Sequence, residues 1–412
     1  MRRREFVAMG VAAGAIAAGT QKAFPAILEA KAKHDAPPRN RRPYSDVDWS
    51  SIKEVHTTSH GHCTNQGMLD GYLERGLDLI TMSNYYPSAP YVPAAEMTAN
   101  HYRLHHRHPV MVKGKRVQGP FDWNRIIDEW KDELPEDLRK TLPFKEGGKM
   151  FKPLPPNVME APNAEHHSFV GSPSHMCCPG SNFASGTFDV RGKYRTNSHS
   201  YSLGSAEPWR DAIDHMLGGL IYPEGGGVTI NHPAWSCLLD SHIQEMLDYD
   251  PRVLGIEVYN QSCHPFAQFR WSRANCEDYW DRTLATGRQC FGFFVPDWAV
   301  KEGVNVLLVQ ERTVKACMEA YRKGNFYGAI KGRHILGFTS IQFDGTRLKV
   351  TLDKKAHVQV LSAKGLLKTG NVDTMEYAVA PADRERHVYL RVRAYALDKS
   401  DEIIFSQPMM LV

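Results

Sequence analysis

The sequence predicts an α/β domain followed by a smaller antiparallel β domain, and three observations support this prediction. Strand-like runs alternate with helical stretches from about residue 52 to about residue 335. Several of these strand-like runs end in clusters of His, Glu or Asp. From residue 337 onward, short runs alternate apolar and polar residues and are separated by turns. Alternating strands and helices favour a parallel sheet or an α/β barrel, whose functional groups lie where strands end.

The elements of the first domain follow from β-type runs and from amphipathic spacing. Strands are expected at 77–82, 227–231, 254–259 and 289–295, and helices at 68–75, 209–217, 268–286 and 313–323. A long proline-rich insertion, residues 86–160, interrupts the alternation and is expected to form a lid or an elaborated loop. Its His105, His106 and His108 are expected to be exposed polar residues and not metal ligands.

Residues 337–412 are expected to form a small antiparallel β-sandwich. Four strand-like runs are found here, at 348–352, 357–361, 388–394 and 403–405. The first three alternate apolar and polar residues, and turn residues such as Asp344-Gly345 stand near them. Such alternation with short turns is typical of antiparallel strands that bury one face. The simplest role for this region is structural.

The N-terminus has the features of an export signal. Three arginines at positions 2–4 precede an uncharged run of small and apolar residues from Ala8 to Gly19. That run is shorter than the roughly 20 residues of a membrane-spanning helix, and Arg3–Val7 resembles the twin-arginine consensus. We therefore expect residues 1–32 to be a signal read by the twin-arginine export machinery, and residues 33–50 to be a polar, proline-rich linker. The mature chain is then expected to be periplasmic or otherwise extracytoplasmic, with no stable membrane span.

Composition narrows the class of function. The chain has 50 Lys and Arg against 46 Asp and Glu, a formal charge of +4, and it has no basic run rich in aromatics. Nucleic acid is therefore not expected as the main partner. The 19 His residues are more informative, because imidazole is the commonest neutral nitrogen ligand of transition metals. The eight Cys lack the Cys-x-x-Cys spacing of zinc ribbons, and no disulfide pairing is predicted from them.

A His-x-His pair is the first candidate metal site. His60 and His62 flank Gly61 near the end of a strand-like run. Side chains at positions i and i+2 of a strand point to the same side, so both imidazoles can reach one cation. Gly61 would leave room for the metal between them. Because a chance pair is as common as a ligand pair, and His56 competes for the role, this motif needs support from other residues.

Further polar residues at strand ends supply that support. Glu165 can bridge two divalent ions through its two oxygens, and His175 follows it in the chain. His232 ends an apolar strand in Asn-His-Pro, where a barrel strand opens into its functional loop. Glu257 lies inside a β run and Asp297 ends another, and a carboxylate there needs a cation or hydrogen-bond donors. A structural role remains the alternative for each acid and for His232.

These motifs, in this order, resemble the polymerase-and-histidinol-phosphatase (PHP) superfamily. The similarity runs from His-x-His through a Glu with a following His, Asn-His-Pro and Glu-Val-Tyr-Asn to a strand that ends in Asp. It covers about residues 52–335 and is most specific from Gly225 to Asp297. The resemblance implies a distorted (β/α)7 barrel, here at residues 51–336, that holds two or three divalent metal ions and hydrolyses phosphate esters.

The resemblance also implies which residues would form the site. One ion would be held by His60, His62, Glu165 and Asp297, and a second by Glu165, His175 and His232. Glu165 and Asp297 would be the catalytic residues, and zinc, manganese or iron the candidate metals. Tyr85 and His264 are the expected substrate contacts, and His199 is an alternative to His175.

The sequence departs from the family at two places. Ser83-Asn84-Tyr85 stands where the family usually has Thr-Asp-His, and Asp297-Trp298-Ala299 stands where it has Asp-x-His. Two His ligands of the family are thus missing, so we expect a two-metal site. The expected function is that of an exported phosphoesterase using a metal-activated water on a small phosphorylated substrate. The alternative is a catalytically degraded barrel that binds a ligand or a carbohydrate.

Overall fold

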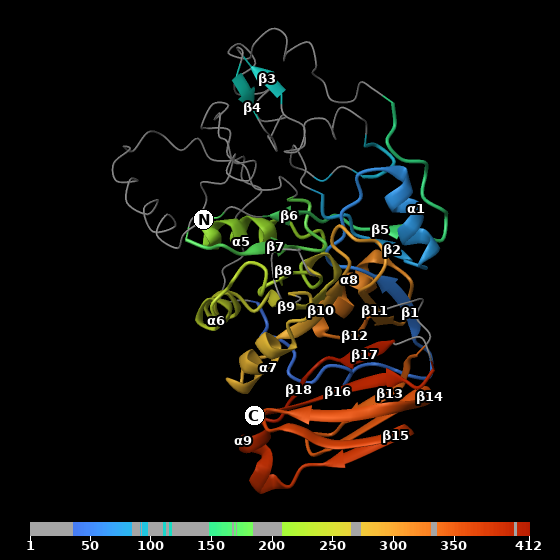
Figure 1. The fold of residues 1–412 in the computed structure, drawn as a ribbon, viewed down its shortest axis with the longest axis vertical. Coiled ribbons are helices and arrows are strands. Elements are labelled where there is room, and N and C mark those ends of the chain that lie inside the picture. Colours follow the sequence, from blue (N-terminus) through green and yellow to red (C-terminus); the bar gives the residue numbers. More distant parts are fainter. Residues whose placement is uncertain are drawn as a thin grey trace.

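The computed structural model describes residues 36–84, 91, 93–97, 110–112, 115–117, 148–166, 169, 171–183, 208–264, 273–330, 336–398 and 402–412. Within these residues the strands form a sheet of eleven, a sheet of five and a two-stranded hairpin, with helices between many of them along the chain. The α/β class predicted from the sequence is confirmed. Figure 1 shows the C-terminal strands, in orange and red, gathered at one end of the described part of the molecule.

The larger sheet includes the strand that precedes the His-x-His pair. β1 (Lys53–Thr57) pairs in parallel with β2 (Leu79–Ile80), which pairs in parallel with β5 (Met159–Glu160). On its other side, β1 is antiparallel to β11 (Val304–Val309), and β11 is antiparallel to β12 (Phe326–Ile330). Two helices accompany these strands, α1 (Gln66–Glu74) and α8 (Val314–Lys323). Both lie close to their predicted positions.

The smaller sheet contains three strands that are buried on both faces. β8 (Val228–Asn231), β9 (Val253–Asn260) and β10 (Phe291–Val295) are parallel neighbours, and every residue in them is buried. β7 (His175–Cys177) and β6 (Glu165–His166) extend this sheet beyond β8 in antiparallel order. Strands covered on both faces are continuous apolar runs in sequence, which explains why the three parallel strands could be predicted.

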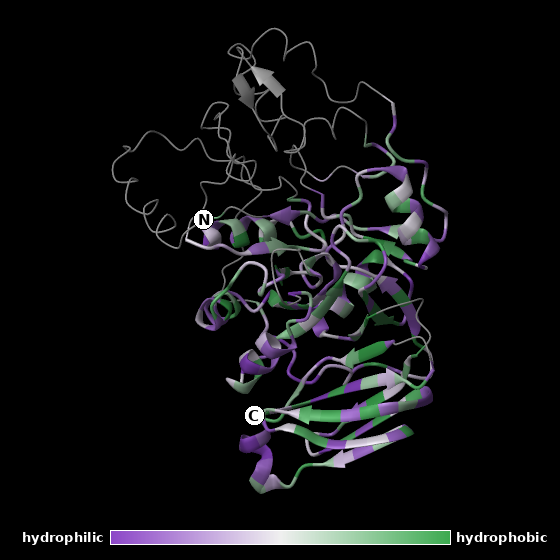
Figure 2. Ribbon diagram, viewed as in Figure 1, coloured by the Kyte–Doolittle hydropathy of each residue, from purple (hydrophilic) through white to green (hydrophobic). Residues whose placement is uncertain are grey.

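Three helices belong to the smaller sheet, α5 (Trp209–Gly218), α6 (Asp240–Tyr249) and α7 (Glu277–Ala285). Their fully buried side chains Ile213, Ile243 and Trp280 share one core cluster with residues of β8 and β9. Figure 2 shows green and purple residues on different sides of α6, as expected for a helix that buries one face. No helix in the described residues is long and apolar enough to cross a membrane.

Two contacts beyond the strand ends join the sheets. Gly61 and Asp297 form a parallel bridge that links the segment after β1 to the segment after β10. The backbone N–H of Glu165, at the start of β6, donates to the carbonyl of Ser83, which follows β2. Apart from the β3–β4 hairpin, the described strands form two sheets, and no closed barrel is found among them. The candidate ligands Glu165 and Asp297 lie at these junctions, so the meeting of the two sheets positions the site.

The C-terminal strands are antiparallel, as predicted. They are β13 (Phe338–Phe343), β14 (Arg347–Ser362), β15 (Gly365–Ala378), β16 (Tyr389–Ala396), β17 (Ile403–Ser406) and β18 (Met409–Met410). β13 and β16 pair with successive parts of β14, and β17 joins β16 to β12. The C-terminal strands therefore continue the larger sheet. β17 also covers an edge of β12 that would otherwise expose unpaired backbone groups. A short helix, α9 (Arg384–His387), interrupts them without a signal in the sequence.

The predicted insertion 86–160 lies mostly outside the described residues. Its described parts include a hairpin of β3 (Val110–Val112) and β4 (Lys115–Val117), as well as β5. Its three candidate surface His, at positions 105, 106 and 108, are outside the described residues.

The described part of the predicted linker lies against the folded body. The Arg39 guanidinium donates to the carbonyls of Leu247 and Val253 at 2.8 and 2.9 Å, which ties the segment to the end of α6 and the start of β9. The Tyr44 hydroxyl donates to the carbonyl of Phe326 in β12 at 2.7 Å. These bonds connect the segment to both sheets, so its described residues are part of the folded structure.

An ion network fixes α7 to β16. Arg391 is 1% exposed and donates to Asp281 at 2.7 and 2.8 Å and to Glu277 at 3.0 Å. Arg393 donates to both oxygens of Glu277 at 2.9 Å, and the Tyr389 hydroxyl donates to Asp281 at 2.7 Å. Removing one member of a buried ion pair leaves the other charge uncompensated. We therefore expect this network to stabilise the packing of α7 against the C-terminal strands.

We expect Arg391→Met to lower the free energy of unfolding by about 2 kcal/mol, because Asp281 and Glu277 lose their hydrogen bonds to a buried guanidinium while Asp281 stays partly exposed to water. Urea unfolding followed by tryptophan fluorescence measures this change. Arg386→Met is the matched control, since it removes an exposed arginine paired with Asp383, and it should change the value by less than about 0.5 kcal/mol. Equal effects of the two substitutions would contradict this account of the joint.

Candidate metal centre

His60 and His62 lie in the segment that leaves β1, and both side chains are fully buried. The hydroxyl of Tyr72 donates to the His62 carbonyl at 2.9 Å and holds the segment against α1. A Cβ atom at Gly61 would lie 3.0 Å from both Thr58 and Tyr72, which is a very close contact. Close packing against Thr58 and Tyr72 therefore explains why a glycine stands at position 61. The sequence had suggested a different reason, room for a metal.

Two carboxylates form a first group with these imidazoles. The Nε2 atoms of His60 and His62 are 3.4 Å apart, and Glu165 Oε2 lies 3.3 Å from the first and 3.0 Å from the second. Asp297 Oδ1 lies 3.4 Å from both Nε2 atoms. Ligands of a tetrahedral zinc ion are about 3.3 Å from one another when each is about 2.0–2.1 Å from the metal. The observed separations are therefore those of atoms that can share one cation.

A second group uses the other oxygen of Glu165. Its Oε1 lies 2.7 Å from His175 Nδ1 and 3.2 Å from His232 Nε2. His175 starts β7 and His232 follows the neighbouring β8, so strand pairing brings the two imidazoles together. In each group the possible ligand atoms of the two His and Glu165 all lie within 4.8 Å of one another. One carboxylate therefore faces two pairs of imidazoles, one pair with each oxygen.

The electrostatics of the cluster centre on Glu165. Burial disfavours its charged form, but the charges of His60 and His175 outweigh burial and hold the pKa of Glu165 well below its usual range. For His60, burial lowers the pKa, but the charges of Asp297 and Glu165 and of other neighbours raise it well above the ordinary value. The cluster thus concentrates carboxylate charge in a buried place, where a cation or protonated imidazoles must balance it.

Two of the candidate ligands have a left-handed backbone. The φ angle is 28° at His232 and 55° at Asp297, a region that residues with a Cβ atom rarely occupy. His232 directly follows β8 and precedes Pro233, whereas Asp297 follows β10 and Pro296. Strain of this kind persists only where the surrounding structure enforces it, and it is concentrated at functional sites. The strained backbone therefore marks these two strand ends as the functional edge.

The residues present fit a divalent metal. Asp297 Oδ1 is buried and accepts no hydrogen bond within the described residues, although a buried carboxylate oxygen is costly without a partner. Imidazole nitrogens mixed with carboxylate oxygens suit zinc, manganese or iron. The side chains that could hold metal are His60, His62, Glu165, His175, His232 and Asp297, and Glu257 forms a further such group with His60 and His232. They offer two adjacent cation positions bridged by one carboxylate.

Glu257 was noticed in the sequence but not placed at the site. It is fully buried, and its Oε1 lies 2.7 Å from His60 Nδ1. Its Oε2 accepts hydrogen bonds from the His232 backbone N–H at 2.7 Å and from Asn260 Nδ2 at 2.8 Å. A carboxylate on the far nitrogen of a metal-binding imidazole fixes its tautomer and orientation. In the sequence, Glu257 is an acid inside an apolar strand. Such an acid needs partners, but the sequence does not identify them.

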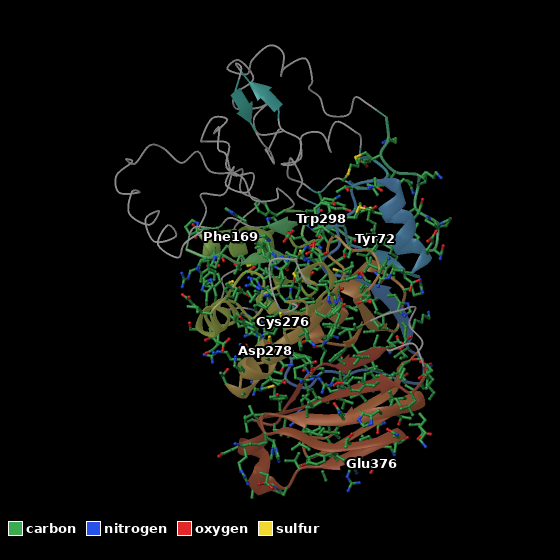
Figure 3. All side chains as sticks on the ribbon, viewed as in Figure 1. Tyr72, Phe169, Cys276, Asp278, Trp298 and Glu376 are labelled. Carbon is green, nitrogen blue, oxygen red and sulfur yellow. The ribbon has the colours of Figure 1, made fainter. Side chains whose placement is uncertain are left out.

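The positions near the two missing family His carry structural contacts. Asn84 accepts a hydrogen bond from the Cys63 N–H and donates one to the Cys63 carbonyl, each at 2.8 Å. Trp298 stacks on His62, with ring centroids 3.9 Å apart and planes inclined by 13°. Figure 3 shows Trp298 in the part of the body away from the C-terminal strands. Both residues hold the His-x-His segment in place.

Two other residues considered from the sequence, His264 and His56, do not join the cluster. His264 is exposed, and its Nε2 lies 3.1 Å from the hydroxyl of Tyr259. His56 Nδ1 lies 3.3 Å from Asp78 Oδ2, and His56 belongs to none of the metal-like groups in the described part of the chain. Tyr85 and His199 lie outside the described residues.

All eight cysteines are described, and each is a free thiol. Seven are buried and Cys237 is exposed. Burial raises the pKa of the Cys63 thiol to about 12 and raises that of Cys177 as well. The buried thiols next to the cluster are therefore neutral, and the metal-like groups found here consist of His and Glu.

Comparison with known proteins adds little to this geometry. No protein-family model matches the chain, and no curated protein sequence matches it. One solved structure is similar: a two-domain protein from Bacteroides vulgatus that contains a predicted PHP-like metal-dependent phosphoesterase. The two chains are 13% identical over 90% of this chain and 91% of the other, with a TM-score of 0.39. A likeness at this level does not establish the family, and the case for function depends on the site.

We expect Glu257→Gln to lower the affinity for a divalent metal about ten- to a hundredfold, because the amide cannot orient His60 as a carboxylate does. Competition with a chromogenic chelator measures the affinity. Glu376→Gln is the matched control, since Glu376 pairs with Lys349 in the C-terminal strands, and Figure 3 shows it far from Trp298. An unchanged affinity in Glu257→Gln would show that Glu257 does not position the centre.

Proposed function

We propose that this protein is a metal-dependent hydrolase of phosphoric esters that works with two divalent ions. The observation that carries the proposal is the position of Glu165, whose two oxygens each face a different pair of imidazoles at 2.7–3.3 Å. Two ions about 3.5–4 Å apart are a recurring arrangement in phosphatases and nucleases. A structural acid in a core would instead be satisfied by hydrogen-bond donors without gathering four imidazoles around it.

Each residue of the cluster has a role in this proposal. One ion would be held by His60, His62, Asp297 and Glu165, and the other by His175, His232 and Glu165. When bound, such ions polarise phosphoryl oxygens and lower the pKa of water toward neutrality. Glu165 and Asp297 are the proposed catalytic residues. Tyr85 and His264 are proposed as substrate contacts.

We also propose that the two sheets are halves of a distorted (β/α)7 barrel of PHP type. In this proposal the ring would be made of β1 and β2 from the larger sheet and β6, β7, β8, β9 and β10 from the smaller one. It would close through the two junctions described above, Ser83 with Glu165 and Gly61 with Asp297. The antiparallel β6 and β7 and these narrow junctions would account for the distortion. The order of the motifs along the chain supports the same assignment. Residues 337–412 are then a second domain, proposed to be a β-sandwich.

The proposed location is the periplasm or another extracytoplasmic compartment, reached by the twin-arginine route. The support is the sequence of residues 1–32, which lie outside the described residues. Seven buried free thiols are compatible with this route, because a protein that crosses the membrane already folded keeps its cysteines covered. The proposed substrate is a small phosphorylated molecule.

The purified protein should contain about two divalent ions per chain, and Glu165→Gln should lose both because it removes the shared ligand. Metal analysis by plasma mass spectrometry measures the content. Hydrolysis of p-nitrophenyl phosphate and bis(p-nitrophenyl) phosphate should fall at least about a hundredfold in Glu165→Gln and after chelation, and should return to the chelated wild type when metal is added.

Glu245→Gln is the matched control for this experiment, since Glu245 is an exposed acid paired with Arg210. It should keep both metal and activity. Full activity without metal, or in Glu165→Gln, would overturn the proposed function. Two bound ions without turnover of any ester would instead support the alternative, a barrel of this type that binds a ligand or a carbohydrate.

A double substitution, Arg3→Lys with Arg4→Lys, should block export, because the twin-arginine machinery reads that pair. Cell fractionation and immunoblotting of the full chain should show at least about a tenfold fall in the extracytoplasmic fraction. Arg2→Lys is the matched control and should be exported normally. Normal export of the double variant would contradict the proposed route.

A further inference from the structure

The candidate ligands differ in the exposure of their side chains. Those of His60 and His62 are 0% exposed, that of His232 is 4% exposed, that of Asp297 is 9% exposed and that of His175 is 15% exposed. Trp298 also stacks on the His62 ring and covers one of its faces. Within the described residues, His175 is therefore the most exposed of the candidate ligands, and we take the phosphoryl group to approach the cluster past it.

Trp235 stands beside His175. Its ring centroid lies 5.3 Å from that of His175 and 5.0 Å from that of His232, and both contacts are edge-to-face. It is 37% exposed, and it is the one aromatic residue among the exposed large apolar side chains of the described residues. Leu239, later in the same loop, is also exposed. Exposed apolar surface that adjoins a buried polar cluster is a typical ligand-binding feature.

The backbone holds Trp235 in a fixed position. Its N–H donates to the carbonyl of His232 at 2.9 Å, and its carbonyl accepts a hydrogen bond from Arg273 at 3.2 Å. Cys237, two positions later, has a φ of 53°, so the loop is held in an uncommon conformation. With its backbone held and its ring packed against His175 and His232, Trp235 loses less conformational entropy when a ligand stacks on it than a mobile side chain would.

Two polar atoms next to Trp235 have partners within the protein. Ser236 Oγ lies 3.2 Å from His232 Nδ1, and Nη1 of Arg273 is bonded to the Trp235 carbonyl. A sugar bound here would need donors and acceptors for its hydroxyl groups, whereas a flat aromatic ring needs only an apolar face. The exposed indole beside His175 therefore suits an aromatic ring.

We propose that Trp235 is the platform for the leaving group of the ester, and that this leaving group carries an aromatic ring. The inference rests on the proposed function, and it adds the class of substrate. With the phosphoryl group at the cluster, the rest of the substrate remains outside on the His175 side. There the ring stacks on the indole of Trp235, a contact that tolerates many ring structures because it reads only the aromatic face.

Two alkyl phosphates test this inference, 2-phenylethyl phosphate and butyl phosphate. Their leaving alcohols are similar in acidity, so the ratio of kcat/KM between them reports recognition of the ring and not leaving-group chemistry. Trp235→Ala should lower that ratio about tenfold, and Trp235→Phe should restore most of it. Leu366→Ala removes an exposed apolar side chain from β15, and it should leave the ratio unchanged.

Binding is measured separately by calorimetry with 2-phenylethylphosphonate and butylphosphonate, which are not hydrolysed, on the metal-loaded protein. The preference for the phenyl compound should fall in Trp235→Ala by the same factor. If neither ester is hydrolysed and neither phosphonate binds, the proposed function fails and this inference fails with it. Suppose instead that both esters are hydrolysed. If Trp235→Ala then leaves the ratio unchanged, or lowers turnover of glucose 6-phosphate more than that of the phenyl ester, the aromatic class of substrate is wrong. The phosphoesterase function stands in that case.

Discussion

The contact between the Glu165 carboxylate and two pairs of imidazoles is the interaction on which the site depends. Its Oε2 faces His60 and His62, and its Oε1 faces His175 and His232. A charged carboxylate in a buried place is costly unless other groups compensate it, and here the imidazoles do so strongly enough to keep its pKa low. Residues from several strands are thereby tied to one side chain, and the separate motifs of the sequence become one site.

The fold places that carboxylate where its two sheets meet. The backbone of Glu165 is bonded to the segment after β2, and the Gly61–Asp297 bridge joins the segments after β1 and β10. The left-handed backbone at His232 and Asp297 turns the chain sharply at the ends of β8 and β10. Glu257 then connects the two halves of the cluster, because it contacts both His60 and His232. The strand ends, the strained residues and the shared carboxylates all lie where the two sheets meet.

Sequence patterns identified the buried parallel strands and the residues now found together, because apolar runs and their polar ends are local features. The strand β11 and the helix α6 were not among the predicted elements, and a four-residue helix such as α9 has no periodic pattern to recognise. Contacts between residues far apart in the sequence could not be predicted, because no local pattern indicates them. Nothing near Arg39 in the sequence indicates that it reaches carbonyls at Leu247 and Val253, and nothing near Trp298 indicates that it stacks on His62.

The central claim is that one carboxylate bridges two metal positions, and anomalous X-ray scattering from crystals of the purified protein tests it most directly. Data recorded at the absorption edges of zinc, iron and manganese should show two peaks about 3.5–4 Å apart. One should adjoin His60 and His62, the other His175 and His232, with Glu165 between them. A single peak that does not contact Glu165, or no peak in protein shown to contain metal, would contradict the account.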